Sequence, residues 1–378
     1  MVIYKRASNV KHWNKIVVMI AALLGLKVDE KSIMHQKARR PSFLCLLLAL
    51  SLSAFSAEVL AVKPLSRIVV FGTSISDPGN MFFILKTDPG IFCDVVTPPT
   101  TNSPPYKLLD PLRIPDRPYS IDGHHFSNGP TWIEQAGDRL GLDDSVGPAF
   151  RNHHDKYVHT SNYAVSGARA WNADYPCRVN LQDQLDAFKA DFGGKAPSNA
   201  LYVIEFGAND IRDALDRGDP TLISDAVEAI YDAVHELYLM GARKFVFATA
   251  PNIGRTWALQ ALDKYEQPGV AALGEGLSQA FNAGLAAVVA EVKKLPGVNS
   301  VKTLDVFGTF NRILNHPQAF HLSNVTDTCV TPLIEPYDCK KPDRYFFWDG
   351  IHPTKAVHAI FANQAITLIL GGKQGHYH

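Results

Sequence analysis

The sequence predicts an α/β protein, a three-layer α/β/α sandwich in which a mostly parallel sheet carries helices on both faces. Short apolar runs without polar/apolar alternation recur along the chain, which suits strands that are buried on both faces. Segments with helical spacing lie between them, and strands that alternate with helices form parallel β-α-β units. The apolar runs are Ile68–Phe71, Tyr163–Val165, Leu201–Phe206, Lys244–Ala250 and Val301–Val306.

The clearest helical pattern follows the third of these runs. Apolar residues from Ile223 to Leu237 recur at steps of four, three, four and three, which places them on one face of a helix. Asp219 and Pro220 are typical of a helix start, and Gly241 is typical of a helix end. We therefore predict a long amphipathic helix between the third and fourth strands.

Two further helices and two loops complete the predicted order. Helical patterns cover residues 273–292 and 354–370. The Pro-rich stretch at 97–118 and the stretch at 308–345 are predicted to be long loops. Ligands of such sheets bind at the carboxyl ends of the strands, where loops of this kind can wall a cleft.

Composition limits the class of protein and of partner. The chain has 378 residues with 46% hydrophobic and 20% charged residues, which is ordinary for a globular protein. Residues 1–61 hold nine Lys/Arg and three Asp/Glu, so the remainder holds 28 basic and 34 acidic residues, a net charge of −6. This mildly acidic body argues against nucleic acid as a partner. We predict a single domain over residues 62–378.

The first 61 residues resemble an extension followed by a secretory signal. A cationic stretch, Met34 to Arg40, precedes about ten apolar residues and then small residues, which is the pattern of a signal peptide. Cleavage after Ser56 or Ala61 fits, and a membrane anchor is the alternative. Met34 is a candidate true start. We predict that the protein is secreted or periplasmic.

Cysteine usage agrees with export. Cys45 lies in the predicted signal, and four cysteines remain, an even number that suggests two disulfides in an exported chain. The pairing predicted here is Cys329 with Cys339, which closes a small loop, and Cys93 with Cys177. Four buried free thiols are the alternative.

A serine nucleophile with its base is the leading chemical interpretation. Ser74 comes directly after the first apolar run, and Asp349 stands three residues before His352. A serine hydroxyl needs a base to take its proton, and the base works best when a carboxylate orients it. Taken singly these signals are weak, because most such serines cap helices and most Asp/His pairs at this spacing are surface contacts.

Two more residues provide hydrogen-bond donors near the same edge of the sheet. Gly167 follows the second predicted strand and Asn209 follows the third. A backbone N–H at Gly167, a side-chain amide at Asn209 and the Ser74 N–H would stabilise the oxyanion of a tetrahedral intermediate. A turn glycine and a turn asparagine are the plainer interpretation of each alone.

Taken together, four blocks in this order resemble the GDSL, or SGNH, hydrolases. The stretch Phe71 to Asn80 is similar to the nucleophile block, Asn162 to Ala168 to the second, Gly207 to Asp210 to the third and Asp349 to Thr354 to the last. Phe126 to Pro130 and Pro251 to Arg255 resemble stretches of secreted bacterial and fungal members. The resemblance implies a flavodoxin-like fold, a catalytic triad of Ser74, Asp349 and His352, an oxyanion hole of Ser74, Gly167 and Asn209, and no metal or other cofactor.

Three positions depart from the family pattern. Thr73 and Ile75 flank Ser74 where the name-giving motif has Asp and Leu, and neither flank carries a proton in the mechanism. Arg169 stands where many members carry a smaller Thr. This cation suits either a phosphate on the substrate or a nearby carboxylate, and we favour the carboxylate.

We therefore predict a secreted serine esterase/lipase that hydrolyses carboxylic esters through an acyl-enzyme. The substrate is a small-molecule or lipid ester, with transient contact to a lipid surface. Lipid, aryl and acetyl esters stay open, as do phospholipase, lysophospholipase and polysaccharide acetylesterase activities. No oligomeric state is predicted.

Two rival classes are weaker. A metal-dependent phosphoesterase would use Asp77, Asn209, Asp210 and His352, but the spacing of metal ligands is poor. The adjacent pairs His124-His125 and His153-His154 are predicted to be solvent-facing loop residues. A binding module without catalysis fits the 10% aromatic content, and the intact set of Ser74, Asp349 and His352 argues against it.

Overall fold

A computed structural model describes residues 65–87, 119–152, 160–171, 178–330 and 339–371. Contacts divide the chain into two compact units, Met1–Pro64 and Leu65–His378, and every described residue lies in the second. The predicted extension and signal, Cys93, Cys177, the 97–118 stretch and His153-His154 lie outside the described residues.

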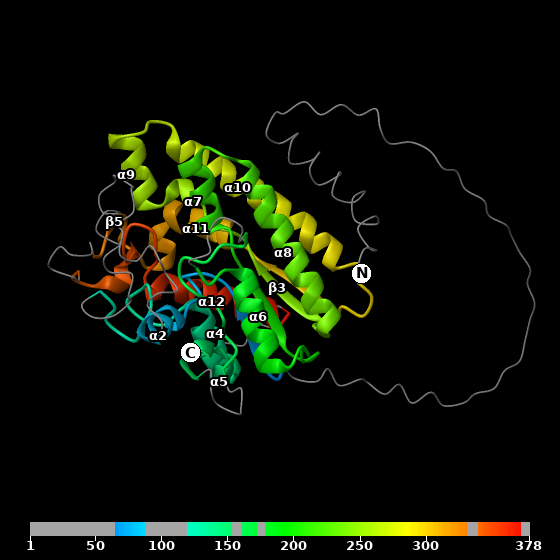
Figure 1. The fold of residues 1–378 in the computed structure, drawn as a ribbon. Helices are drawn as coiled ribbons and strands as arrows, with labels where there is room; N and C mark the ends of the chain where they lie inside the picture. The colour runs from blue at the N-terminus through cyan, green and yellow to red at the C-terminus, as the bar shows by residue number, and fades with distance from the viewer. Residues whose placement is uncertain (1–64, 88–118, 153–159, 172–177, 331–338, 372–378) are drawn as a thin grey trace, which may run out of the picture. The chain divides into compact units, whose positions relative to one another are not determined.

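Helices and strands alternate along the described residues (Figure 1). The strands are β1 (Ile68–Phe71), β2 (Leu201–Glu205), β3 (Lys244–Ala248), β4 (Ser300–Leu304), β5 (Asn324–Thr328) and β6 (Tyr345–Phe347). The α-helices are α2 (Asn80–Thr87), α4 (Trp132–Leu140), α5 (Asp143–Val146), α6 (Leu181–Phe192), α7 (Ala208–Arg217), α8 (Thr221–Met240), α9 (Trp257–Tyr265), α10 (Val270–Val292), α11 (Val306–Asn315) and α12 (Lys355–Ile369). Short 3₁₀ turns lie at Ala149–Asn152, Ile253–Arg255, Pro317–Phe320 and Pro342–Arg344.

The central sheet is parallel, with the strand order β1-β2-β3-β4. Strands β1 and β2 are buried along their whole length, which explains why their sequences are apolar without alternation. Strands β5 and β6 form a separate parallel pair. Because neighbouring strands run in the same direction, the carboxyl ends of β1 and β2 share one edge, where ligands bind in sheets of this kind.

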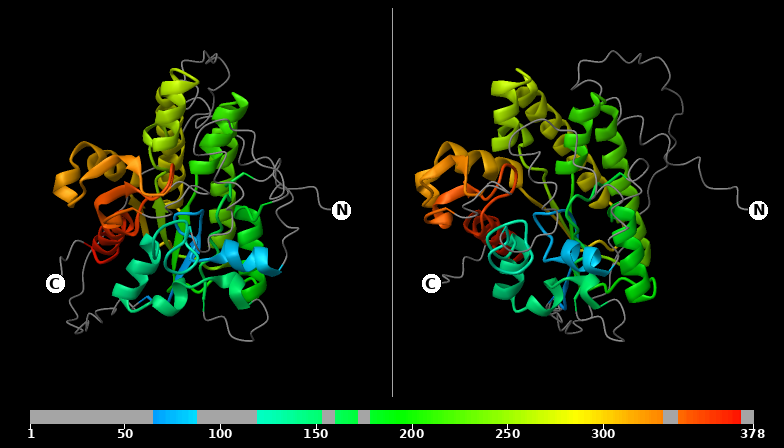
Figure 2. Two further views of the ribbon diagram at one scale, coloured as in Figure 1. Left: turned by 90° about the vertical axis from the view of Figure 1, so that its left-hand side faces the viewer. Right: turned by 60° about the vertical axis from the view of Figure 1, so that its left-hand side comes forward.

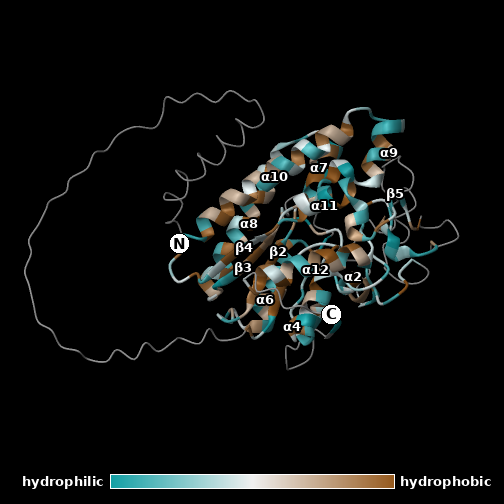
Figure 3. Ribbon diagram, turned by 180° about the vertical axis from the view of Figure 1, so that it is seen from behind, coloured by the Kyte–Doolittle hydropathy of each residue, from teal (hydrophilic) through white to brown (hydrophobic). Residues whose placement is uncertain are grey.

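Helices cover both faces of the sheet, as predicted (Figures 1 and 2). Alternate strand residues point to opposite faces. In β1, Val69 and Phe71 join a core cluster with α6, α7, α8 and α10, whereas Ile68 and Val70 join a second cluster with α4, α11 and α12. Figure 3 shows the hydrophobic colour of the central strands and the mixed colouring of the helices around them. The predicted three-layer α/β sandwich is confirmed.

The three predicted helices form with nearly the predicted bounds. Helix α8 buries Ile223, Val227, Ile230, Val234 and Leu237, which are the residues of the periodic pattern. It ends at a glycine with φ of 120°, whose N–H donates to a carbonyl of the last turn. Helices α10 and α12 match the predicted patterns at residues 273–292 and 354–370.

The segment Tyr163–Val165 lies beside β1, as a neighbouring strand would, but it does not form the predicted strand. Only Asn162 pairs with Val70 in an isolated parallel bridge, next to which the Tyr163 N–H donates to the Val70 carbonyl at 2.8 Å. The N–H of Gly72, which would continue this ladder, donates instead to Gln184 Oε1 at 2.9 Å. Regular strand pairing therefore ends after one bridge, although the Val165 N–H still donates to the Gly72 carbonyl at 3.1 Å.

The predicted long loop at 308–345 is also wrong. It contains most of α11 and all of β5, and β6 begins at its last residue. The residues Val306, Phe310 and Ile313 are separated by four and three positions and are all buried, so this segment follows a helical pattern after all. Among the described residues, no helix combines the length and the apolar character needed to cross a bilayer.

Candidate active site

Ser74, His352 and Asp349 form one continuous set of hydrogen bonds. Ser74 lies in the turn after β1, and its Oγ is 2.8 Å from Nε2 of His352. The Nδ1 atom of the same ring is 2.8 Å from Oδ2 of Asp349. A carboxylate at Nδ1 favours the tautomer that leaves Nε2 free to accept a proton from the serine. The structure thus brings together three residues that lie up to 278 positions apart.

The Asp349 carboxylate is buried and fully hydrogen bonded. Its Oδ1 accepts the backbone N–H groups of Ile351 at 2.8 Å and His352 at 2.7 Å, which folds the short turn that makes the three-residue spacing work. Burial alone would raise the pKa of Asp349. The charge of His352, and hydrogen bonds from His352 and from Tyr119, outweigh burial and hold the pKa below its ordinary value. Asp349 therefore stays ionised beside the imidazole.

The turn that carries Ser74 is fixed from beneath by two buried side chains. Gln184 of α6 accepts the Gly72 N–H and donates to the Gly72 carbonyl, both at 2.9 Å. Glu205 at the end of β2 accepts the Thr73 N–H at 2.9 Å and the Thr73 hydroxyl at 3.0 Å. A Cβ atom on Gly72 would meet the Glu205 carboxylate at 2.9 Å, so this approach requires glycine.

Asn209 contacts the loop that carries Gly167, the other further residue of the predicted oxyanion hole. Gly167 has a φ of 76°, a conformation that favours glycine. Asn209, in the first turn of α7, donates one amide hydrogen to the carbonyl of the neighbouring Ala168 at 2.8 Å and retains a second. Asp77 ties the Gly167 loop to the Ser74 turn, because its Oδ2 accepts the Ser166 N–H at 2.8 Å while its Oδ1 caps α2.

Comparison with known proteins assigns this arrangement to a family. The sequence profile of the GDSL-like lipase/acylhydrolase family matches residues 68–365. The chain belongs to this family. A GDSL esterase/lipase of Arabidopsis thaliana is 28% identical over 336 residues, which is 79% of this chain and 84% of the relative.

A second similar protein, the phosphatidylcholine-sterol acyltransferase of Aeromonas hydrophila, is 24% identical over 374 residues, which is 86% of this chain and 96% of that protein. A solved α/β hydrolase from the metagenome of Lake Arreo in Spain has a TM-score of 0.42 at 15% identity, over 83% of this chain and 99% of that one. Membership in the GDSL family, whose plant members are esterase/lipases, makes this chain a carboxylic ester hydrolase.

In this GDSL hydrolase, Arg169 is paired with protein groups. Its Nε and Nη2 atoms lie 2.7 and 2.8 Å from the two carboxylate oxygens of Asp213, and its Nη1 donates to the Gly167 carbonyl. This bidentate pair is the carboxylate contact that we favoured over a phosphate on the substrate. Arg169 therefore stiffens the Gly167 loop.

The residues of the rival metal site have other partners. All four hydrogen bonds of the Asp77 carboxylate come from backbone N–H groups. Asp210 accepts the N–H groups of Ala170 at 2.9 Å and Trp171 at 3.3 Å. Burial raises the pKa of both carboxyl groups to about 6. No cluster of three or more His, Cys, Asp or Glu side chains suited to a metal is found in the described ranges.

The 119–128 loop, whose role was not predicted from the sequence, covers the segment that carries Asp349 and His352. The Tyr119 hydroxyl donates to Asp349 Oδ2 at 2.6 Å, and the ring of Phe126 lies 5.3 Å from the His352 ring. Ser127 donates to the carbonyl of Pro353 at 2.8 Å. These partners lie more than 220 positions away, and no local pattern signals such contacts.

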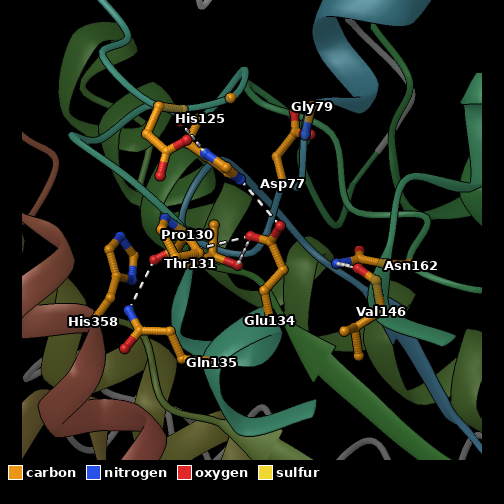
Figure 4. Close-up of polar contacts among 12 residues, drawn as sticks. Asp77, Gly79, His125, Pro130, Thr131, Glu134, Gln135, Val146, Asn162 and His358 are labelled. Atoms are coloured by element: carbon orange, nitrogen blue, oxygen red, sulfur yellow. Dashed lines mark hydrogen bonds and ion pairs between the residues drawn. The ribbon is translucent and has the colours of Figure 1, made fainter. Parts of the chain in front are cut away.

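His125 of the same loop is buried, so the prediction of a solvent-facing residue is wrong. Its Nε2 is 3.0 Å from Glu134 Oε1 and its Nδ1 is 2.8 Å from the Asp122 carbonyl (Figure 4). Burial alone would lower the pKa of His125. The hydrogen bond and charge of Glu134, with the Asp122 carbonyl and the charge of Asp77, raise it to about 9. His125 is a buried cation that links the loop to α4.

The neighbouring His124 stacks on Phe82 with ring centroids 3.5 Å apart. It is only partly exposed. On α12, His358 is also buried, and burial followed by the charges of His125 and His352 lowers its pKa to about 3.

The Cys329–Cys339 disulfide is present, with Cα atoms 5.0 Å apart. This pairing was predicted, and it lies beside the loop that carries Asp349 and His352. The N–H groups of Cys329 and Val330 donate to the carbonyls of Phe347 at 3.0 Å and Trp348 at 2.8 Å, immediately before Asp349.

Proposed function

We propose that this GDSL hydrolase is a serine esterase in which Ser74 is the nucleophile, His352 the general base and acid, and Asp349 the residue that orients His352. The observation that carries the proposal is the pair of 2.8 Å contacts from Ser74 to His352 and from His352 to Asp349. Both lie at the carboxyl edge of the parallel sheet.

In the first half of the reaction the enzyme is acylated. Ser74 Oγ attacks the ester carbonyl carbon as its proton moves to His352 Nε2. The N–H groups of Ser74 and Gly167 and the amide of Asn209 hold the oxyanion. The intermediate collapses, the bond to the alcohol oxygen breaks, and His352 returns the proton to that oxygen.

Water completes the cycle. It attacks the acyl carbon on Ser74 while His352 takes its proton, and a second tetrahedral intermediate forms. Collapse breaks the bond between Ser74 and the acyl group, and the proton returns to the serine oxygen. The net reaction consumes one ester and one water and yields one acid and one alcohol.

Neutral esters of small molecules or lipids are the substrates that the described residues favour. Two arginines lie beside Gly167: Arg178, whose Nε is 3.6 Å from where a Cβ on Gly167 would sit, and Arg169. Arg169 is held by Asp213, with side chains that are 14% and 8% exposed. A pair this buried offers little to a phosphate group. Phe126, packed on His352, gives the site an apolar wall that suits an acyl or aryl group.

A phospholipid acyl donor is the second candidate. It is favoured by the likeness to the phosphatidylcholine-sterol acyltransferase, which extends over most of both chains. Transfer of the acyl group from Ser74 to an alcohol instead of water would need no further residue. Added alcohol would then divert the product from acid to ester.

Secretion is part of the proposal and rests on the signal-like residues 34–61 and on the Cys329–Cys339 disulfide, since disulfides persist in oxidising compartments. N-terminal sequencing of protein from the culture medium tests it. A mature chain that keeps residues 1–33 would refute this signal.

The main test compares wild type with Ser74→Ala on aryl esters of increasing acyl length, an acetylated polysaccharide and a phosphatidylcholine. We expect Ser74→Ala to lose on the order of 10³-fold or more in kcat on every ester that the wild type cleaves. Its melting temperature serves as the control for folding. Retained hydrolysis by a folded Ser74→Ala variant would refute the proposal. The ester that the wild type hydrolyses fastest identifies the substrate class.

A further inference from the structure

Asp349 Oδ2 accepts two side-chain hydrogen bonds, and only one of them comes from the proposed triad. His352 Nδ1 lies at 2.8 Å and the Tyr119 hydroxyl at 2.6 Å. The other oxygen is used by two backbone N–H groups. The oxygen that faces the base is therefore shared between an imidazole and a phenol.

The Tyr119 ring is fixed by packing that does not involve its hydroxyl. The side chain is 1% exposed, and its ring lies 6.1 Å from Phe126 and 6.2 Å from Trp348, centroid to centroid. Burial, and then the charge and hydrogen bond of Asp349, raise the pKa of Tyr119 well above its ordinary value. The phenol therefore stays protonated and donates at every pH at which the enzyme works.

We propose that Tyr119 is a positioning residue of this site: its hydroxyl fixes the Asp349 carboxylate and limits the negative charge that Asp349 presents to His352. The inference rests on the proposed function, because it concerns how the base of that reaction is tuned. A buried phenol needs some acceptor. Here the acceptor is Asp349 Oδ2, which also bonds His352, so the Tyr119 hydrogen bond affects the proposed general base.

The consequence is a defined change in the titration of His352. A hydrogen bond that disperses the charge of a carboxylate weakens its attraction for a neighbouring imidazolium. Without the phenol, Asp349 attracts the protonated imidazole more strongly. The base then holds its proton to higher pH, and the acidic limb of the rate profile moves upward.

Other charged and titratable groups around His352 do not change with Tyr119. On α12, His358 is neutral, and on the 119–128 loop the His125 cation is paired with Glu134. The Ser74 hydroxyl and the Phe126 ring also lie against His352, and neither carries a charge. A shift in the profile of a Tyr119 variant therefore reports on Asp349.

The chain contains a matched control. Tyr163 is 0% exposed, and its hydroxyl donates to Asp191 Oδ2 at 2.6 Å, the same donor, acceptor and length as in the Tyr119 contact. Asp191 lies near the end of α6 and belongs to no part of the proposed site. Tyr163→Phe and Tyr119→Phe each remove one phenol–carboxylate hydrogen bond, partly buried at Tyr163 and buried at Tyr119, and only the bond at Tyr119 touches the triad.

The experiment measures kcat, KM and the pH profile of kcat/KM for wild type, Tyr119→Phe and Tyr163→Phe on one aryl ester. For Tyr119→Phe we expect the apparent pKa of the acidic limb to rise by about 0.5 to 1 unit, and kcat to fall roughly tenfold with KM little changed. For Tyr163→Phe we expect the wild-type profile with a similar loss of stability. A Tyr119→Phe profile equal to that of wild type, or equal shifts in both variants, would overturn the inference.

A second variant covers the case in which Tyr119→Phe does not fold. Incorporation of 3-fluorotyrosine at position 119 keeps the ring and makes the phenol a stronger donor, so the acidic limb should move down. An unmoved limb would also overturn the inference. The Ser74→Ala variant separates a failure of the proposed function from a failure of this inference. If Ser74→Ala is active, the proposed function is refuted. If Ser74→Ala is inactive and the pH profile of Tyr119→Phe equals that of wild type, only the role of Tyr119 is refuted.

Discussion

The turn that carries Ser74 and the loop that carries Asp349 and His352 meet at one 2.8 Å contact, yet they are held in different ways. The Ser74 turn continues a buried strand and is fixed through its backbone by Gln184 and Glu205, which themselves belong to α6 and to β2. The Asp349–His352 loop depends on side chains of the distant 119–128 loop. We therefore expect substitutions in the 119–128 loop to leave the position of Ser74 unchanged and to alter the Asp349–His352 loop.

The two sides should also differ in what a substitution changes. Residues beside Ser74 act on the oxyanion and on the position of the nucleophile, so their loss lowers the rate at every pH. Residues around Asp349 act on the base, so their loss moves the pH profile.

The largest effect is expected on the nucleophile side, from Asn209→Ala. Loss of one oxyanion donor should lower kcat on the order of 10²–10³-fold while the apparent pKa of the acidic limb stays at the wild-type value. Rates across the pH range measure both. Asn282→Ala is the control, because Asn282 bonds the backbone of Ala250 and is no part of the proposed site. A shift in the apparent pKa of the acidic limb, or an unchanged kcat, in Asn209→Ala would contradict the expected difference between the two parts of the site.

The next effect concerns the buried cation of the 119–128 loop. The pKa of His125 is raised to about 9, so its contribution to stability is present in full below about pH 6.5 and is lost as the pH rises through 9. The pH-dependent part amounts to about 3 kcal/mol at most, at 1.36 kcal/mol per pKa unit. In His125→Gln this part is absent. Denaturant unfolding at pH 6, 7.5 and 9 should show the two proteins converging as the pH rises, and a constant difference would count against a charged His125.

The smallest effect comes from two serines that make comparable buried bonds on the two sides. Ser127 donates to the Pro353 carbonyl at 2.8 Å, and Ser161 donates to the Ile68 carbonyl at 2.7 Å. Each alanine variant should lose about 1 kcal/mol of unfolding free energy. Only Ser127→Ala should also lower kcat, by roughly twofold to fivefold, because Pro353 adjoins His352. Equal kcat in both variants would show that the 119–128 loop does not support the base.

Local pattern was enough for the parts of the molecule that are local. The strand before Ser74, the helix periodicity of α8, and the three-residue step from Asp349 to His352 are all visible in the sequence, and each forms as predicted. α11 is predictable too, because Val306, Phe310 and Ile313 carry its spacing, although Val306 falls in the predicted strand Val301–Val306 and the other two in the predicted loop.

Long-range contacts were not predictable in this way. The partner of Tyr119 lies 230 positions away, and a tyrosine at the end of a Pro-rich stretch gives no sign of it. His125 was taken as solvent-facing because its burial depends on Glu134 and on the fold around it. The single bridge at Asn162 likewise depends on Gln184, which takes the N–H that would have extended the strand. Such features arise from tertiary packing, which overrides local propensity.

The central claim is that Ser74 is the nucleophile and is activated by His352. The most direct measurement is covalent labelling of the wild type by a serine-directed phosphonate, followed by peptide mapping, with His352→Ala treated alongside. We predict one label, on Ser74, and labelling slower by on the order of 10³-fold in His352→Ala. A label on another serine, or equal rates in the two proteins, would contradict the account.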